Sequence, residues 1–273
     1  MLNRFTWVLL IAFSLGIIWW IFATKNPLTP GNESHPFSNS SAMFELVDPE
    51  MAPDQIKPLV MQGYHILSET KKYLPEYAGD RLSCNNCHFA AGNTLGGANS
   101  GISLVGVTKN YPKFLAENPN YTLADRINAC FEKSLNGKAL PVDSQPMKAM
   151  LAYLEWISHH ITMKKAPWLG LKELRSHHTP DSIKGQEVYA IYCASCHGAE
   201  GQGEPRAENL SYPPLWGASS FNEAAGMNNL SKLSAFVYYN MPFGEAELTV
   251  EQALDVSAFI IAQPKPKWKG EGG

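Results

Sequence analysis

The chain has 273 residues, 45% of them hydrophobic, which is enough for two ordinary domains with buried cores. Its formal net charge is −3, and the sequence has no long run of like charge. A nucleic-acid partner is therefore not expected, because such partners call for a concentrated basic face.

The N-terminus predicts a membrane-spanning helix. After Arg4, an uncharged and mostly apolar run extends from Phe5 to Ala23 and includes the bulky pair Trp19 and Trp20. Roughly 20 apolar residues cross a bilayer as a helix, and Trp favours the membrane interface. We expect residues 1–25 to be an uncleaved signal anchor in the bacterial inner membrane, with the rest on the periplasmic side. A cleaved signal peptide is the alternative.

The remaining boundaries follow from Pro-, Ser-, Asn- and Gly-rich stretches. Residues 26–50 are expected to form a flexible tether. A linker at 166–184 then separates a first domain, 51–165, from a second, 185–263. Residues 264–273 are polar and Pro-containing, and we expect a loose tail.

Two short motifs determine the chemical class. "CNNCH" and "CASCH" both match C-x-x-C-H, the attachment sequence of c-type haem, in which two thiols form thioethers and the histidine ligates iron. A zinc site gives no reason for a histidine directly after both cysteine pairs. We expect two covalently bound haem c groups. Their residues are Cys84, Cys87, His88, Cys193, Cys196 and His197.

The motifs also reveal an internal repeat. His88 and His197 are 109 residues apart, about the size of a small helical cytochrome domain. Similar lead-ins, "QGYHILSETKKYL" and "KGQEVYAIY", precede the two motifs and favour helices. The predicted fold is all-α, with two tandem class I-like cytochrome c domains behind the anchor helix.

The second haem has a candidate sixth ligand in Met241. It lies 44 residues after His197 and is followed by a helix that begins with a capping box at Thr249 and Gln252. Methionine is a usual second ligand in cytochromes c, where it raises the potential. Met227 is the rival ligand, and a core role for Met241 is the other alternative.

Cys130, the fifth cysteine, lies 42 residues after His88, where the first domain has no Met-Pro segment. Thr122 can cap its helix and Gly137 can end it. Leu123, Ile127 and Phe131 form one apolar stripe, and a second line runs beside it. That second line consists of Arg126, Cys130 and Ser134.

These three side chains suggest sulfur chemistry. A cation and a ferric iron favour the thiolate of Cys130, which could both ligate the first haem and act as a nucleophile. The alternatives are an inert buried cysteine, a surface arginine and an ordinary helix hydroxyl. His159 and His160 could supply a histidine ligand instead, whereas a loop position predicts that His177 and His178 are solvated.

The segments "RLSCNNCHFAAGNT", "YPKF" and "LADRINACFEKSLNGKAL", with "SFNEAAGMNNL" and "NMPFGEAELTVEQALDVSAFI", resemble the dihaem thiosulfate dehydrogenases, which also act as tetrathionate reductases. The resemblance covers Ile56 to Gln263. It implies that His88 and Cys130 ligate the first haem and that His197 and Met241 ligate the second. Arg126 and Ser134 match its anion-binding positions.

The resemblance has one departure. An arginine is expected just after the Tyr-Pro of the first domain, where this chain has Lys113. The A subunit of the Sox system shares some of these features.

Three functions are therefore open. The first is oxidation of two thiosulfates to tetrathionate, or the reverse reduction, with a cytochrome c or respiratory oxidase as electron partner. The second is a membrane-anchored electron carrier without its own substrate. The third is a Sox-like enzyme that conjugates thiosulfate to a carrier protein.

Overall fold

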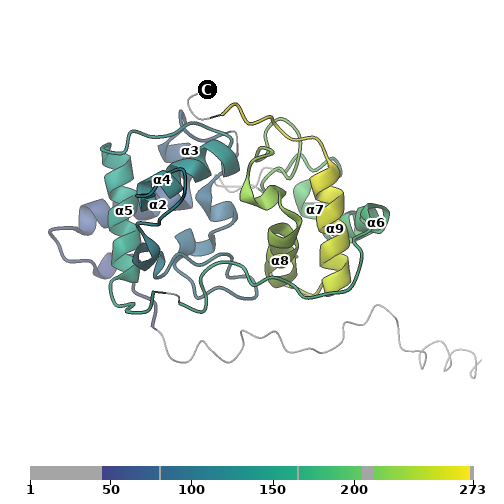
Figure 1. Ribbon diagram of the computed structural model, residues 1–273, viewed down its shortest axis with the longest axis horizontal. Coiled ribbons are helices and arrows are strands. Elements are labelled where there is room, and N and C mark those ends of the chain that lie inside the picture. The colour runs from purple at the N-terminus through teal and green to yellow at the C-terminus, as the bar shows by residue number, and fades with distance from the viewer. Residues whose placement is uncertain (1–44, 80, 165, 205–211, 271–273) are drawn as a thin grey trace, which may run out of the picture. The chain divides into compact units, whose positions relative to one another are not determined.

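The computed structural model describes residues 45–79, 81–164, 166–204 and 212–270. The described chain is helical, and its strand pairing is confined to two isolated bridges, Ser103 with Leu169 and Lys113 with Tyr121. The predicted all-α class with two cytochrome c domains is confirmed (Figure 1).

In the first domain, helices α2 and α5 pack against each other, and the first motif lies between them in the sequence. Between the helices α2 and α5, short 3₁₀ and π turns carry the functional segments. The elements are η2 (Pro49–Met51), α2 (Lys57–Ser68), α3 (Thr70–Tyr73), η3 (Cys84–Asn86), η4 (Phe89–Gly92), η5 (Val107–Asn110), α4 (Leu123–Ala129), the π-helix η6 (Cys130–Ser134) and α5 (Gln145–Ser158).

The second domain repeats this plan in a shorter form. Its elements are α6 (Ser182–Tyr192), α7 (Ala194–His197), η7 (Gly226–Asn228), α8 (Leu230–Asn240) and α9 (Val250–Ala262). Helices α2 and α6 lead into the two motifs, as the similar lead-in sequences predicted.

Side-chain caps set the start of the key helices. Thr122 Oγ1 accepts the Asp125 N–H at 3.2 Å, and Asp125 Oδ2 accepts the Thr122 N–H at 2.7 Å, which begins α4. The predicted box of Thr249 and Gln252 begins α9 in the same way. Such caps satisfy amide groups that a helix start leaves without partners.

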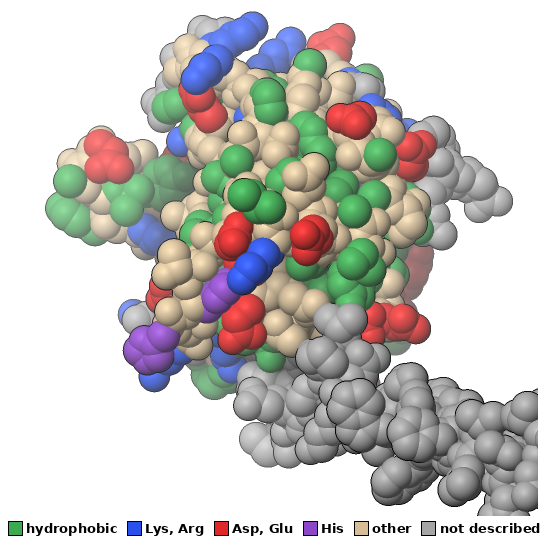
Figure 2. All heavy atoms as spheres, turned by 90° about the vertical axis from the view of Figure 1, so that its right-hand side faces the viewer, with side chains coloured by type: hydrophobic (Ala, Val, Ile, Leu, Met, Phe, Trp, Pro, Cys, Tyr) green, Lys and Arg blue, Asp and Glu red, His purple; other side chains and the backbone are tan. Residues whose placement is uncertain are grey.

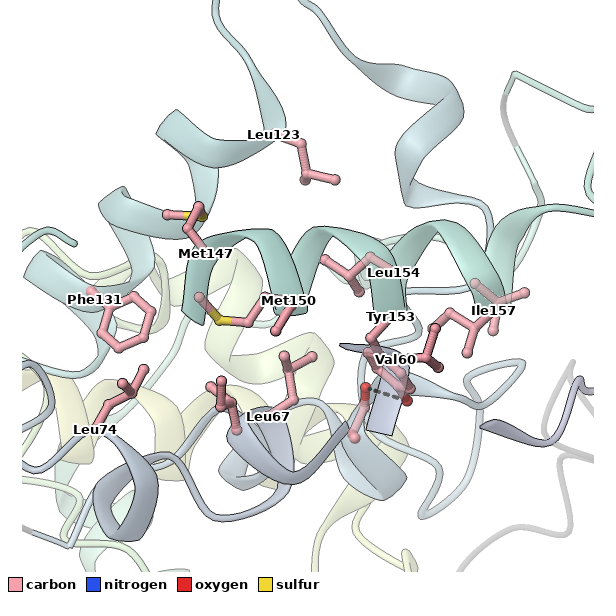
Figure 3. Packing of buried hydrophobic residues seen from close by; sticks show 14 of the residues in the cluster. Val60, Leu67, Leu74, Leu123, Phe131, Met147, Met150, Tyr153, Leu154 and Ile157 are labelled. Carbon is pink, nitrogen blue, oxygen red and sulfur yellow. Dashed lines mark hydrogen bonds between the residues drawn. The ribbon is translucent and has the colours of Figure 1, made fainter. Parts of the chain in front are cut away.

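In each domain the first helix crosses the last at a glycine. A Cβ on Gly63 of α2 would meet the carbonyl oxygen of Ala149 and the Cβ of Tyr153 on α5. A Cβ on Gly185 of α6 would likewise meet the carbonyl oxygen of Asp255 and the Cβ of Phe259 on α9. Two cores form around these crossings, and Figure 3 shows the first, with side chains of α5 facing those of α2.

Residues 264–268 differ from the predicted loose tail. The Pro264 and Pro266 carbonyls accept the N–H groups of Gly217 and Glu223 at 2.8 and 3.0 Å. Lys133 Nζ lies 4.5 Å from the Trp268 ring centroid. The tail is held because a polar, proline-containing segment still offers carbonyl acceptors and an aromatic face to its neighbours.

The predicted anchor at 1–25 and most of the tether at 26–50 lie outside the described residues. Within the described ranges, every helix is too short or too polar to span a bilayer. The other domain boundaries stay predictions.

Replacing Gly63 by Ala is expected to destabilise the protein. Alanine normally favours a helix by about 1 kcal/mol over glycine. Here its methyl would meet backbone atoms of α5, and overpacking costs about 1–3 kcal/mol. Thermal unfolding of the haem-loaded protein should show a midpoint several degrees lower. Gly226→Ala is the control, because its Cβ would meet only the Lys232 side chain at 4.0 Å. Equal midpoints for the two variants would contradict the close crossing.

Candidate active site

The first motif is anchored by the start of α3. Ser83 and Asn86 form a capping box around η3, and the Cys84 N–H donates to Thr70 Oγ1 at 3.0 Å. Thr70 is fully buried. The two cysteines of this motif are therefore presented from a short turn with fixed ends.

In both motif histidines, Nδ1 is hydrogen-bonded to a backbone carbonyl oxygen. His88 Nδ1 lies 2.8 Å from the Ile102 carbonyl oxygen, and His197 Nδ1 lies 2.9 Å from that of Pro213. A carbonyl oxygen only accepts, so Nδ1 carries the proton and Nε2 keeps its lone pair. This is the usual way in which a protein orients a metal-binding histidine.

The acid–base properties of the first motif also fit a haem. Burial, with a smaller effect of the Arg126 charge, lowers the pKa of His88 to about 4, so the imidazole is neutral at neutral pH. Burial raises the pKa of Cys84 and Cys87 to about 12, and the Cys130 charge adds to both. A neutral histidine can ligate the haem iron, and buried thiols can form the thioether bonds of c-type haem attachment.

Arg126 and Cys130 are brought together one helical turn apart. Arg126 Nη1 lies 2.8 Å from Cys130 Sγ. Interaction with Cys130 is the main cause that raises the pKa of Arg126. The predicted apolar stripe beside them is also present, with Phe131 fully buried and Leu123 nearly so.

The helix changes type at Cys130. Residues from Cys130 onward form the π-turn η6, in which the Leu135 N–H donates to the Cys130 carbonyl at 2.9 Å. Such turns are frequent at functional sites. Ser134 is the half-buried last residue of η6, and its place in an anion site stays a prediction.

Two tyrosines that the sequence analysis gave no role complete this cluster. The charges of Tyr111 and Tyr121 also raise the pKa of Arg126. Lys113 and Tyr121 exchange backbone hydrogen bonds at 2.8 and 3.0 Å, and Lys113 Nζ lies 4.6 Å from the Tyr111 ring centroid. Lys113 therefore lies beside Tyr111 and Tyr121. The sequence feature that could have indicated this role is the pair of tyrosines, Tyr111 and Tyr121, at the two ends of the loop between them.

In the second domain, Met241 directly follows α8. Its N–H donates to the Val237 carbonyl at 2.8 Å, and its side chain packs on the same core as Cys193. Met227 packs on that core as well. Ligation by Met241 stays a prediction.

The other histidines have different surroundings. His159 ends α5, where its ring is stacked on Trp156 at 4.7 Å and its Nδ1 lies 2.6 Å from the Trp156 carbonyl oxygen. The expectation of a solvated His178 is wrong, because its Nε2 lies 2.6 Å from Oδ1 of the buried Asp255. The partner is 77 residues away, so the local sequence does not reveal it.

The segment after the first motif contacts the end of α8. The Gly101 N–H donates to Asn240 Oδ1 at 2.8 Å, and the Asn99 N–H donates to the Tyr239 carbonyl at 3.2 Å. Phe89 also packs edge-on against Phe243 at 5.3 Å. The region around the first histidine is thereby joined to the residue before Met241.

Comparison with known proteins agrees with this arrangement. Residues 76–163 match the SoxA/TsdA cytochrome c domain, and residues 182–263 match the cytochrome c family. A thiosulfate dehydrogenase from Allochromatium vinosum is 35% identical over 78% of this chain and 81% of its own length. The chain belongs to the thiosulfate dehydrogenase family.

Further relatives support this membership. A thiosulfate dehydrogenase from Thiomonas intermedia is 36% identical over 80% of this chain and 70% of its own length. The structure of thiosulfate dehydrogenase (TsdBA) from Marichromatium purpuratum matches with a TM-score of 0.75 at 26% identity. The match covers 84% of this chain and 51% of that one, so this chain spans about half of that family member.

Replacement of Met241 by Ala is expected to lower the potential of one haem and to leave the other nearly unchanged. The reason is that methionine ligation raises haem potential, and the only affected site would be the one held by His197. A spectroelectrochemical titration of the purified holoprotein measures both potentials. Met227→Ala serves as the control, and a drop confined to that variant would assign the ligand to Met227 instead.

Proposed function

We propose that this protein oxidises two thiosulfates to one tetrathionate, with Cys130 as the nucleophile. The observation that carries the proposal is the 2.8 Å contact of Arg126 with the Cys130 sulfur, beside the cysteines of the first motif. Membership of the thiosulfate dehydrogenase family supports it independently.

The cofactors are two covalently bound haem c groups. Cys84, Cys87 and His88 would hold the first, together with Cys130. Cys193, Cys196 and His197 hold the second, with Met241 in the corresponding role. When bound, the haems would supply one-electron acceptors.

Arg126 keeps Cys130 in its reactive form. A hydrogen bond to a charged group contributes about 1.5–3 kcal/mol, and here the donor is a guanidinium that remains charged at all relevant pH values. Once Cys130 bonds to sulfur, its negative charge is gone. Arg126 is then available for the sulfonate of the substrate.

The reaction proceeds in two balanced steps. First, the Cys130 thiolate bonds the outer sulfur of one thiosulfate, which gives a cysteine S-thiosulfonate. The two electrons released would pass, by way of the haem groups, to the external electron partner. The outer sulfur of a second thiosulfate then attacks that same outer sulfur, so that tetrathionate leaves and the thiolate is restored. Arg126, Lys113 and Ser134 hold the sulfonate oxygens, and such preorganised charge stabilises a transition state by a few kcal/mol.

The same steps run backwards reduce tetrathionate, so the direction follows from the potential of the electron partner. That partner is a cytochrome c or a respiratory oxidase. Ile183 and Ile191 of α6 are 76% and 71% exposed, and Ile191 comes two residues before Cys193. Figure 2 shows apolar side chains among charges of both signs on this face of the second domain. A surface with exposed apolar side chains among charges suits contact with a redox partner.

Two other candidate functions differ from thiosulfate oxidation in what they require of Cys130 or in their product. A plain electron carrier needs no cysteine paired with an arginine, so the contact of Arg126 with Cys130 argues against it. A Sox-like enzyme would transfer thiosulfate to a carrier protein instead of forming tetrathionate. Product analysis with thiosulfate alone separates this third function from the first.

Replacing Cys130 by Met is expected to keep both haems and to abolish turnover. Methionine can ligate iron but cannot form the persulfide-type bond, so kcat should fall by about 10³-fold or more, as for loss of a nucleophile. Thiosulfate-dependent ferricyanide reduction and tetrathionate-dependent oxidation of a reduced viologen measure both directions. Cys130→Gly controls for ligation by the new side chain. Near wild-type turnover in either variant would contradict the nucleophile role.

We also propose that residues 1–25 anchor the protein to the inner membrane and leave both domains on the periplasmic side. The uncharged run from Phe5 to Ala23 supports this, since its length suits a membrane-spanning helix. A variant with a cleavable signal in place of this run should be released as an active dihaem protein. Fractionation and the ferricyanide assay test it. Release of the unaltered chain to the same extent would favour a cleaved signal.

A further inference from the structure

The π-turn that carries Cys130 ends with carbonyl groups bound from the other domain. Within the turn, the Leu135 and Gly137 N–H groups bond the Cys130 and Phe131 carbonyls, both at 2.9 Å. The next two carbonyls are those of Glu132 and Lys133. A helix end leaves such groups without an intrahelical donor.

Asn222 of the second domain supplies both donors. Its Nδ2 donates to the Glu132 carbonyl at 2.7 Å, and its backbone N–H donates to the Lys133 carbonyl at 3.2 Å. Nδ2 also lies 3.2 Å from Asn136 Oδ1, while Asn222 Oδ1 accepts the Ala224 N–H at 3.1 Å. The residue is 1% exposed, so no water competes for these bonds.

The loop that carries Asn222 is held on its other side by the C-terminal segment. Gly217 and Glu223 flank Asn222, and their N–H groups donate to Pro264 and Pro266 as described above. Lys267 Nζ also pairs with Glu223 Oε2 at 2.7 Å. The loop is therefore fixed on both faces, and Asn222 is a stiff contact.

We propose that Asn222 is a positioning residue that holds the π-turn, and with it Cys130, from the second domain. This inference rests on the proposed role of Cys130 at the first haem. An amide suits this site because its Nδ2 has two hydrogens for two acceptors, the Glu132 carbonyl oxygen and Asn136 Oδ1. Its Oδ1 accepts the Ala224 N–H within the same loop. Loss of Nδ2 removes the donor to the Glu132 carbonyl, and the turn then relaxes toward ordinary helical geometry.

The test compares Asn222→Ala and Asn222→Asp with a control in the haem-loaded full chain. Aspartate keeps the shape and the backbone bond but removes the Nδ2 donor. Ser220→Ala is the matched control. Ser220 is also fully buried and in the same loop, but its hydroxyl bonds only carbonyls of that loop, those of Gly217 and Phe221.

Three readouts are taken. Amide hydrogen exchange at Leu135 and Gly137 should rise at least about tenfold in both Asn222 variants, since exchange reports local opening. The potential of the thiolate-ligated haem should shift while that of the second haem stays, and kcat should fall about tenfold through misplacement of the nucleophile. Ser220→Ala should match the wild type in all three.

Faster exchange with unchanged kcat and an unchanged first-haem potential would overturn the positioning role and leave only a domain contact. Wild-type exchange in both Asn222 variants would overturn the contact itself. The exchange and potential readouts do not depend on the substrate. Their results are therefore independent of whether the protein oxidises thiosulfate, which Cys130→Met tests.

Discussion

The hydrogen bond from each motif histidine to a backbone carbonyl is the constraint on which the rest of the site depends. It fixes the protonated nitrogen of His88 on Ile102 and leaves the other nitrogen for iron. The loop at Ile102 lies close to the motif, and this requires a glycine at position 101. Gly101 has a φ of 67°, and a Cβ at this position would lie 2.7 Å from the Cys87 carbonyl oxygen. A larger residue there would push the acceptor away from the histidine.

The same loop joins the two domains. Gly101 donates to the fully buried Asn240, which directly precedes the predicted ligand Met241. The histidine side of the first motif and the methionine segment of the second are thus parts of one contact. The relative position of the two haem-binding sites is consequently tied to hydrogen bonds between backbone and side chain, which tolerate less displacement than apolar contacts alone.

At Cys130 in the first domain, charge organises the site. The guanidinium of Arg126 pairs with Cys130, and Tyr111 and Tyr121 lie close enough to influence it. The π-turn after Cys130 then delivers its last carbonyls to Asn222. The turn that follows Cys130 in one domain is therefore completed at its end by the other domain.

Local patterns were sufficient for the haem motifs, the all-α class, the caps at Thr122 and Thr249, and the pairing of Arg126 with Cys130. Each depends on residues at most four positions apart, or on a complete motif. Tertiary structure alone decided the bonds of His88, Gly101 and Asn222, whose partners are 14, 139 and 90 residues away. It also decided the contact of His178 with Asp255 and the hydrogen bonds of Pro264 and Pro266. Such contacts form only when separate segments pack together, and packing determines which backbone carbonyl each side chain reaches.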